Sequence, residues 1–202
     1  HFRNAFGGLW TDLSNATDVV DGKLSLGRIA DAQAELLLAW IDQGFVILPG
    51  AVSEEAVDEL NKDIEDIFDM RSDAEVYVES FENNTLRTSL IHKEHKTLRC
   101  KLLDLHSHLE SARAAIFAPA IVDFLSLVFE RPALAFQALS FRRASAQHVH
   151  QDSTYVRVSS PLELAASWIA LEDVQPDSGE LEYYVGRHRP EPYLFEGTKK
   201  WM

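Results

Sequence analysis

The stretch DQGFVILPGAVS, at residues 42–53, indicates the end of a helix, a short strand and a turn. Apolar side chains recur at helical spacing in the preceding residues 30–43, and Gly44 is the residue type that most often ends a helix in the left-handed conformation. The apolar run at residues 45–48 then predicts a strand, which the following Pro-Gly pair turns. We therefore expect the order helix, strand, turn around Gly44.

On either side of this stretch, the chain divides into an arm and one domain. Ser53 is a preferred N-cap residue, and the apolar stripe that follows it predicts a second helix at residues 54–70. Residues 1–29 are mixed in composition and contain several glycines, which indicates an irregular N-terminal arm. Because no Pro/Gly/Ser-rich linker interrupts the remainder, we expect a single domain over residues 30–202.

The second half of the chain has a different pattern. Helical periodicity extends over residues 103–129, after which short apolar runs alternate with turn signals such as Pro-Asp-Ser-Gly at residues 176–179. These runs predict strands at residues 133–141, 147–150, 164–171 and 180–185. Helices followed by strands indicate the α+β class, in which helices pack on an antiparallel sheet or barrel.

The net charge and the cysteine content exclude some classes of binding partner and of metal site. The 202-residue chain carries 19 Lys and Arg against 32 Asp and Glu, a formal net charge of −13. An acidic surface repels phosphate backbones and anionic lipid, so we expect neither a nucleic acid nor a membrane as partner. Cys100 is the single cysteine, which excludes an intrachain disulfide and a Cys-based zinc site and fits a cytoplasmic protein.

The polar cluster His148-Val149-His150-Gln151-Asp152 is the strongest candidate for chemistry. In a strand, residues two apart project to the same face, so His148, His150 and Asp152 share one face. Neighbours on that face lie roughly 6.6 Å apart, and the ends of the trio lie roughly 13 Å apart. Two neighbours can therefore reach one metal ion, as either His148 with His150 or His150 with Asp152, whereas all three cannot without a bend.

A His-x-carboxylate pair on a strand matches two of the three ligands in the facial triad of non-haem Fe(II) oxygenases. An imidazole and a carboxylate suit ferrous iron, and a triad leaves coordination positions open for co-substrate and O₂. The alternative interpretation is structural, with His150 hydrogen-bonded to Asp152 at a polar strand end.

Several segments, taken in order, resemble the phytanoyl-CoA dioxygenase (PhyH) family of Fe(II)/2-oxoglutarate-dependent oxygenases. The first is the stretch at residues 42–53, and the second is HQDSTY at residues 150–155, which resembles the metal-binding strand of the family. The next strand of the family is similar to SWIALEDV at residues 167–174. DSGEL at residues 177–181 and VGRH at residues 185–188 resemble the two turns that come later.

The resemblance implies a double-stranded β-helix core, a cupin-like jelly roll, flanked by N-terminal helices. It also implies Fe(II) as cofactor, 2-oxoglutarate and O₂ as co-substrates, and hydroxylation of an unactivated C–H bond in a small-molecule or acyl substrate. Related halogenases leave the carboxylate position empty for a halide, and Asp152 fills it here, so the resemblance favours a hydroxylase. Residues 30–202 would then form one PhyH-like dioxygenase domain.

The resemblance also assigns roles to individual residues. His150 and Asp152 correspond to the first two metal ligands. Arg142 and Arg143 are adjacent on a predicted strand, so at most one of them can face the co-substrate pocket. The residues that correspond to co-substrate-binding positions are Gln137, Trp168, Arg142 and Lys101.

The third metal ligand of the family, a His, and the Arg that follows it to bind 2-oxoglutarate have no counterpart up to Met202. We therefore expect a longer protein, with this His and the last strands of the barrel beyond Met202. His188 and His148 are alternative third ligands, although the resemblance makes His188 a structural turn residue. Two competing hypotheses are a cupin-like site of His148, His150 and His188 without 2-oxoglutarate, and a catalytically incomplete jelly-roll binding module.

Overall fold

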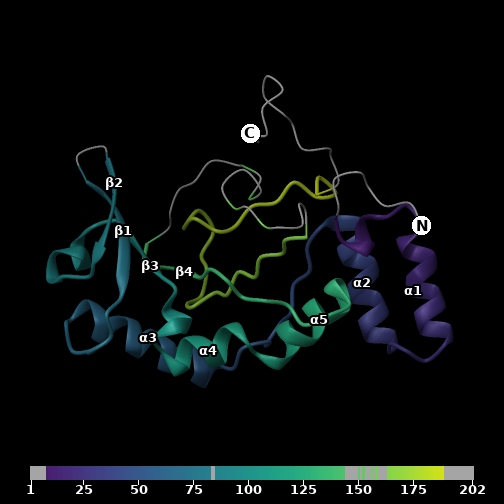
Figure 1. Ribbon diagram of the computed structural model, residues 1–202, viewed down its shortest axis with the longest axis horizontal. Coiled ribbons are helices and arrows are strands. Elements are labelled where there is room, and N and C mark those ends of the chain that lie inside the picture. Colours follow the sequence, from purple (N-terminus) through teal and green to yellow (C-terminus); the bar gives the residue numbers. More distant parts are fainter. Residues whose placement is uncertain are drawn as a thin grey trace.

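The computed structural model describes residues 8–82, 85–143, 150, 152, 156, 158 and 163–188. In this part of the chain, five α-helices and a four-stranded antiparallel sheet form a mixed α/β fold (Figure 1). The helices are α1 (Ala16–Ser25), α2 (Asp31–Gln43), α3 (Glu54–Phe68), α4 (Glu110–Ile116) and α5 (Pro119–Phe129). The strands are β1 (Tyr77–Glu82), β2 (Thr85–Leu90), β3 (Cys100–Leu103) and β4 (Leu139–Phe141). The 3₁₀-helices are η1 (Trp10–Asp12), η2 (Lys93–Thr97) and η3 (Leu105–Ser107).

The sheet has the strand order β2-β1-β3-β4, and one of its faces is buried. Val78 and Leu102 are register partners on β1 and β3, and both belong to a core that includes Phe68 of α3 and Ala115 of α4. Because side chains alternate along a strand, the residues between these core positions point to the opposite face. We call that opposite face, away from α3, the open face of the sheet.

A second core joins η1, α1, α2 and α5 at the other end of the molecule (Figure 1). The indole nitrogen of Trp10 donates to the Leu127 carbonyl of α5 at 3.0 Å, and that of Trp40 donates to the Thr11 hydroxyl at 3.2 Å. Trp40 also meets the ring of Phe124 edge to face, with centroids 5.6 Å apart. The polar ends of both indoles are thus satisfied inside an apolar cluster.

The predicted irregular arm at residues 1–29 is wrong for residues 16–25, which form α1. Ala16 and Val20 lie one helical turn apart and are both buried against the second core. This apolar stripe is short. Gly22 lies within the helix and Gly27 just after it, and glycine lowers the helix propensity of the segment. The local sequence pattern for α1 is therefore weak, and the helix is stabilised mainly by its packing against α2 and η1.

The two helices predicted at residues 30–43 and 54–70 are confirmed as α2 and α3. Helix α2 ends at Gln43, and α3 ends at Phe68. Gly44 adopts a φ of 87° and donates its amide to the Trp40 carbonyl, which ends α2 in the left-handed conformation. The Ser53 hydroxyl accepts from the Ala56 amide at 3.3 Å and caps α3. Residues 45–48 between the helices, which were predicted to be a strand, form no strand in the structure.

Most of the strands predicted in the second half are not found in the described part of the chain. Of residues 133–141, the structure assigns 139–141 to β4, and it assigns no strand within 164–171 or 180–185. Residues 147–149 of the remaining segment lie outside the described residues. The sheet is antiparallel and helices pack on one face of it, as expected, but a closed jelly roll is not observed in the described residues.

Among the described residues, no single helix is long and apolar enough to cross a membrane. Helices α4 and α5 pass a test of length and composition only as a pair, and the pair is bent by 51° at the break between them. Ile121, Phe124 and Val128 of α5 are buried within the protein, as in the core helix of a globular domain.

Candidate metal centre and its surroundings

His150 and Asp152 contact each other in the structure. The Nε2 atom of His150 lies 3.4 Å from Oδ1 of Asp152, and the two side chains are 27% and 57% exposed. The Asp152 carbonyl accepts a hydrogen bond from the Val156 amide at 2.8 Å, a spacing of four residues that is typical of a helical turn. The imidazole and the carboxylate are thus within reach of one ion, and both remain accessible to solvent.

The donor atoms of this pair fit a divalent metal ion. Two ligand atoms that lie about 2.1 Å from one octahedral ion and at right angles to each other are about 3.0 Å apart. The observed separation of 3.4 Å is close to that value, and one nitrogen with one oxygen donor suits Fe(II). In the described part of the chain, no group of three His, Cys, Asp or Glu side chains is placed to hold a metal ion. This part therefore supplies two ligands.

Tyr183 lies near this pair, although nothing in the sequence pattern singled it out. Burial raises the pKa of the Tyr183 phenol, and the negative charge of Asp152 raises that pKa further. The ring of Tyr183 stacks on the ring of Phe45, with centroids 5.2 Å apart and planes inclined by 8°. An aromatic residue in a predicted strand is ordinarily a core residue, so nothing in the sequence predicted that Tyr183 would lie near the candidate metal ligands.

The turn at residues 185–188 packs against the end of α2. The Gly186 amide donates to the Gln43 carbonyl at 2.8 Å. A Cβ atom added to Gly44 would lie 2.4 Å from Nδ1 of His188, so the His188 ring occupies the space that a side chain at Gly44 would need. These contacts hold the turn on the helix and support the structural role of His188 over its role as a third ligand.

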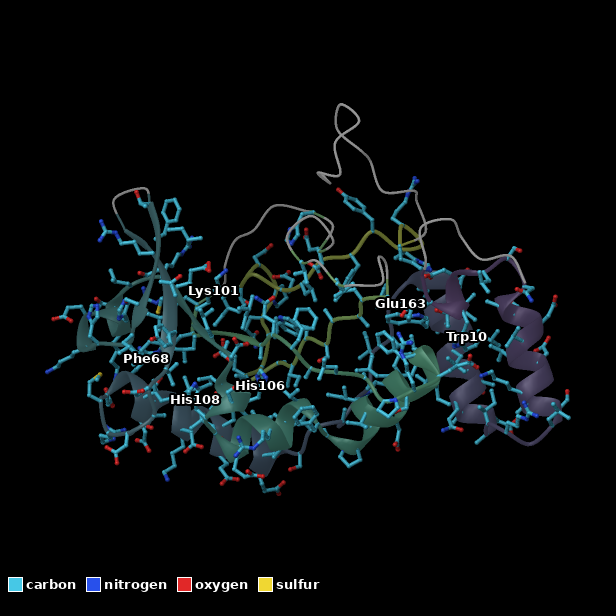
Figure 2. The ribbon with its side chains drawn as sticks, viewed as in Figure 1. Trp10, Phe68, Lys101, His106, His108 and Glu163 are labelled. Carbon is cyan, nitrogen blue, oxygen red and sulfur yellow. The ribbon has the colours of Figure 1, made fainter. Side chains whose placement is uncertain are left out.

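Lys101 lies on the open face of the sheet (Figure 2). It is the register partner of Glu79, and its Nζ atom lies 2.5 Å from Oε1 of that residue. Both side chains are about three quarters buried or more, with exposed fractions of 25% for Lys101 and 19% for Glu79. The surrounding side chains on this face are exposed and apolar, namely Tyr77, Phe81, Leu86, Leu90, Leu139 and Phe141.

Arg142 lies on the other side of the sheet, against α3. Its Nε atom is 3.1 Å from Oε1 of Glu65, and its guanidinium centre is 5.5 Å from the ring centroid of Phe68. Another guanidinium nitrogen donates to the Lys96 carbonyl at 3.2 Å. Because Lys101 and Arg142 lie on opposite faces, the structure does not bring these two predicted co-substrate ligands together.

The remaining predicted residues are placed as follows. Gln137 is exposed and precedes Ala138, whose amide and carbonyl are both hydrogen-bonded to Asp104 at 2.8 Å. Trp168 is 53% exposed, whereas its neighbour Ile169 packs on the core beneath the sheet. His148 lies outside the described residues.

Comparison with known families places the chain in a class. A family model described as Phytanoyl-CoA dioxygenase (PhyH) matches residues 40–200, which include His150 and Asp152. This match defines an enzyme of the oxygenase class. Because the match covers more than half of the 202 residues, the chain belongs to the phytanoyl-CoA dioxygenase (PhyH) family, which generally depends on Fe(II) and 2-oxoglutarate. Searches of curated proteins and of solved structures found no match.

Proposed function

We propose that this protein is an Fe(II)- and 2-oxoglutarate-dependent hydroxylase that acts on an unactivated C–H bond of a small-molecule or acyl substrate. One observation carries the proposal: the donor atoms of His150 and Asp152 lie 3.4 Å apart within the segment that the family model matches. The reaction would convert a C–H group, O₂ and 2-oxoglutarate into a C–OH group, succinate and CO₂.

His150 and Asp152 would hold the metal ion, together with a third ligand from outside the described residues. When bound, Fe(II) supplies the oxidising chemistry, and the protein supplies the binding geometry. The Asp152 carboxylate would occupy the position that stays empty for a halide in related halogenases. It would also offset one positive charge of the ion, and both properties favour hydroxylation.

We assign a carboxylate of 2-oxoglutarate to Lys101 rather than to Arg142. The Lys101 ammonium group lies on the open face, within an apolar surrounding that strengthens its attraction for an anion. Its present partner is the Glu79 carboxylate, which a substrate carboxylate could replace one for one. Arg142, which also has a carboxylate partner in Glu65, lies on the opposite side of the sheet.

The proposed activity is tested with the full-length protein, Fe(II), ascorbate and 2-oxoglutarate under air. We expect succinate to form at a rate that requires added Fe(II) and stops when a chelator is added, because such oxygenases also turn over 2-oxoglutarate slowly without substrate. Candidate substrates that fit should raise the rate. Failure to detect succinate in the iron-loaded protein, with or without candidate substrates, would exclude the proposal.

The role of Lys101 is tested by a pair of variants. Lys101→Met should raise the KM for 2-oxoglutarate by roughly tenfold, with a smaller effect on kcat, since it removes one charge-assisted hydrogen bond from the bound carboxylate. Arg142→Met removes the same charge from the opposite face and should leave this KM within about twofold of the wild-type value. Equal effects of the two substitutions would contradict the assignment.

The competing hypothesis of a catalytically incomplete binding module has one observation in its favour. Within the described residues, the His150–Asp152 pair has no third His, Cys, Asp or Glu placed beside it to complete a metal site. Under this hypothesis, the full-length protein should bind less than one equivalent of Fe(II) and form no succinate. Metal analysis of the full-length protein therefore separates the two functions.

A further inference from the structure

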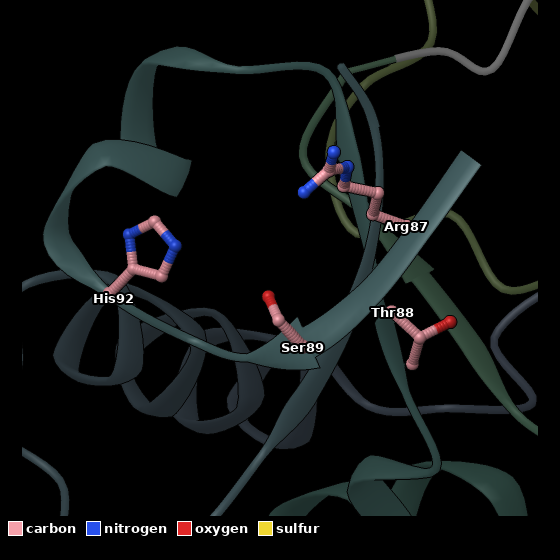
Figure 3. A pocket seen from close by; sticks show the side chains of 4 residues that line it. All are labelled: Arg87, Thr88, Ser89 and His92. Atoms are coloured by element: carbon pink, nitrogen blue, oxygen red, sulfur yellow. The ribbon is translucent and has the colours of Figure 1, made fainter. Parts of the chain in front are cut away.

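A hollow lies at an edge of the sheet, where β2 leads into η2. It measures about 420 Å³ and is lined by Arg87, Thr88, Ser89 and His92. Arg87 and Ser89 are two residues apart on β2 and therefore share one face. Figure 3 shows the Arg87 guanidinium, the Ser89 hydroxyl and the His92 imidazole directed toward the same space, with the Thr88 side chain directed away from it. These residues play no part in the site proposed above.

The walls of this hollow are held in place from two sides. Every residue of β2 is paired in register with β1, which fixes the face of the sheet from which the Arg87 and Ser89 side chains project. The His92 amide donates to Nδ1 of His95 at 3.0 Å, and the rings of the two histidines lie 3.8 Å apart between centroids. Because His95 is fully buried, it anchors His92 to the body of the protein. The backbone that carries the lining residues of the hollow is therefore preorganised.

Arg87 is one of the cations in the described residues that have no carboxylate partner. A carboxylate does pair with each of seven other Lys and Arg side chains in the described residues, namely Lys23, Arg71, Lys96, Lys101, Arg113, Arg131 and Arg142. Within the same part of the chain, no carboxylate lies within ion-pair distance of Arg87. The carboxylate that contacts the lining of the hollow is Glu94, which lies 2.6 Å from Nδ1 of His92.

Glu94 does not neutralise the hollow as a whole. A backbone hydrogen bond, followed by the contact with His92, lowers the pKa of Glu94, so this carboxylate stays ionised and engaged with Nδ1 of the imidazole. The guanidinium of Arg87 and the hydroxyl of Ser89 are left as the donors that an incoming group would meet. A ligand with several acceptor oxygens around one centre satisfies them together.

We propose that the hollow binds the phosphate group of a small molecule. The planar guanidinium can donate two hydrogen bonds to a phosphate, and the Ser89 hydroxyl can donate to another of its oxygens. With Nδ1 of His92 engaged by Glu94, Nε2 of that imidazole can accept a hydrogen bond from a protonated phosphate oxygen. A nucleic acid is disfavoured as the source of the phosphate, because a net charge of −13 repels an extended polyanion. The site is separate from the His150–Asp152 pair, so it does not depend on the proposed oxygenase activity.

The test is a titration of the full-length protein with inorganic phosphate at constant ionic strength, followed by ¹H–¹⁵N NMR. We expect saturable shifts of the backbone amides of residues 87–92. Arg87→Gln should weaken the affinity by roughly tenfold or more, Arg87→Lys by less, and Ser89→Ala by a few-fold, since each removes charge-assisted or neutral hydrogen bonds. The matched control is Arg28→Gln, which removes the same charge from an exposed arginine outside the hollow and should leave the affinity unchanged.

Three results would overturn the assignment. The first is the absence of saturable shifts at residues 87–92. The second is an equal loss of affinity in Arg28→Gln, which would mean that only the overall charge matters. The third is acetate binding as tightly as phosphate, which would make the hollow a carboxylate site instead. Thermal unfolding curves of the variants, expected to match the wild type because the substituted side chains lie at the surface, verify that the fold is intact.

Discussion

Asp152→Ala in the full-length protein is expected to abolish Fe(II) binding and to lower 2-oxoglutarate-dependent succinate formation by at least roughly 100-fold, more than the loss of an outer-shell partner causes. The substitution removes one of the two donors that lie 3.4 Å apart and leaves the imidazole of His150 as the only ligand of this pair. Iron content after anaerobic loading and the initial rate of succinate formation are the two measurements.

Two further variants make this result specific. Asp152→Glu keeps a carboxylate and should retain part of the iron binding, because the donor type is unchanged. Asp173→Ala removes an exposed carboxylate from the neighbouring segment and should behave like the wild type. A variant Asp152→Ala that keeps its metal would instead favour the cupin-like site of His148, His150 and His188.

Gly44→Ala is expected to lower the free energy of unfolding by about 3 kcal/mol, through two effects that act together. Gly44 has a φ of 87°, a conformation that costs an L-residue about 1 kcal/mol or more. The added Cβ would also lie 2.4 Å from Nδ1 of His188, so the turn at residues 185–188 must move away from α2. Chemical denaturation monitored by circular dichroism measures the loss.

Substitutions at two other glycines separate the backbone effect from the steric effect. Gly27 has a φ of 64° with open space around its Cβ position, so Gly27→Ala should cost about 1 kcal/mol from the backbone alone. Gly22 lies within α1, also with open space, and Gly22→Ala should stabilise by about 0.5–1 kcal/mol. If Gly44→Ala costs no more than Gly27→Ala, the contact with His188 does not contribute to stability.

Two segments that precede this turn were predicted to be strands and are not. Residues 164–171 and 180–185 have the composition of strands, but a strand also requires a neighbouring strand to pair with it. In the structure, one backbone group at the end of the first segment and one next to the second segment bond to helix residues. The Asn61 side chain on α3 donates to the Leu171 carbonyl at 2.7 Å, and the Gly186 amide donates to Gln43 at the end of α2.

For helix α1, the sequence pattern was too weak to predict a helix, and tertiary packing stabilises one there. Two buried residues one turn apart, Ala16 and Val20, are a weak signal in a segment that contains glycines. By contrast, α2 and α3 could be predicted nearly to the residue, because Gly44 and Ser53 mark their ends through local backbone chemistry.

The sequence by itself determined the acidic charge, the family and the choice of His150 and Asp152 as the proposed metal ligands, because these depend on residue type and short spacing alone. The tertiary structure decided which side chains meet. Strand register placed Lys101 and Arg142 on opposite faces, and the packing of residues 183–188 on α2 brought Tyr183 against Phe45. Contacts between residues distant in the chain follow from register and packing, which no local pattern encodes.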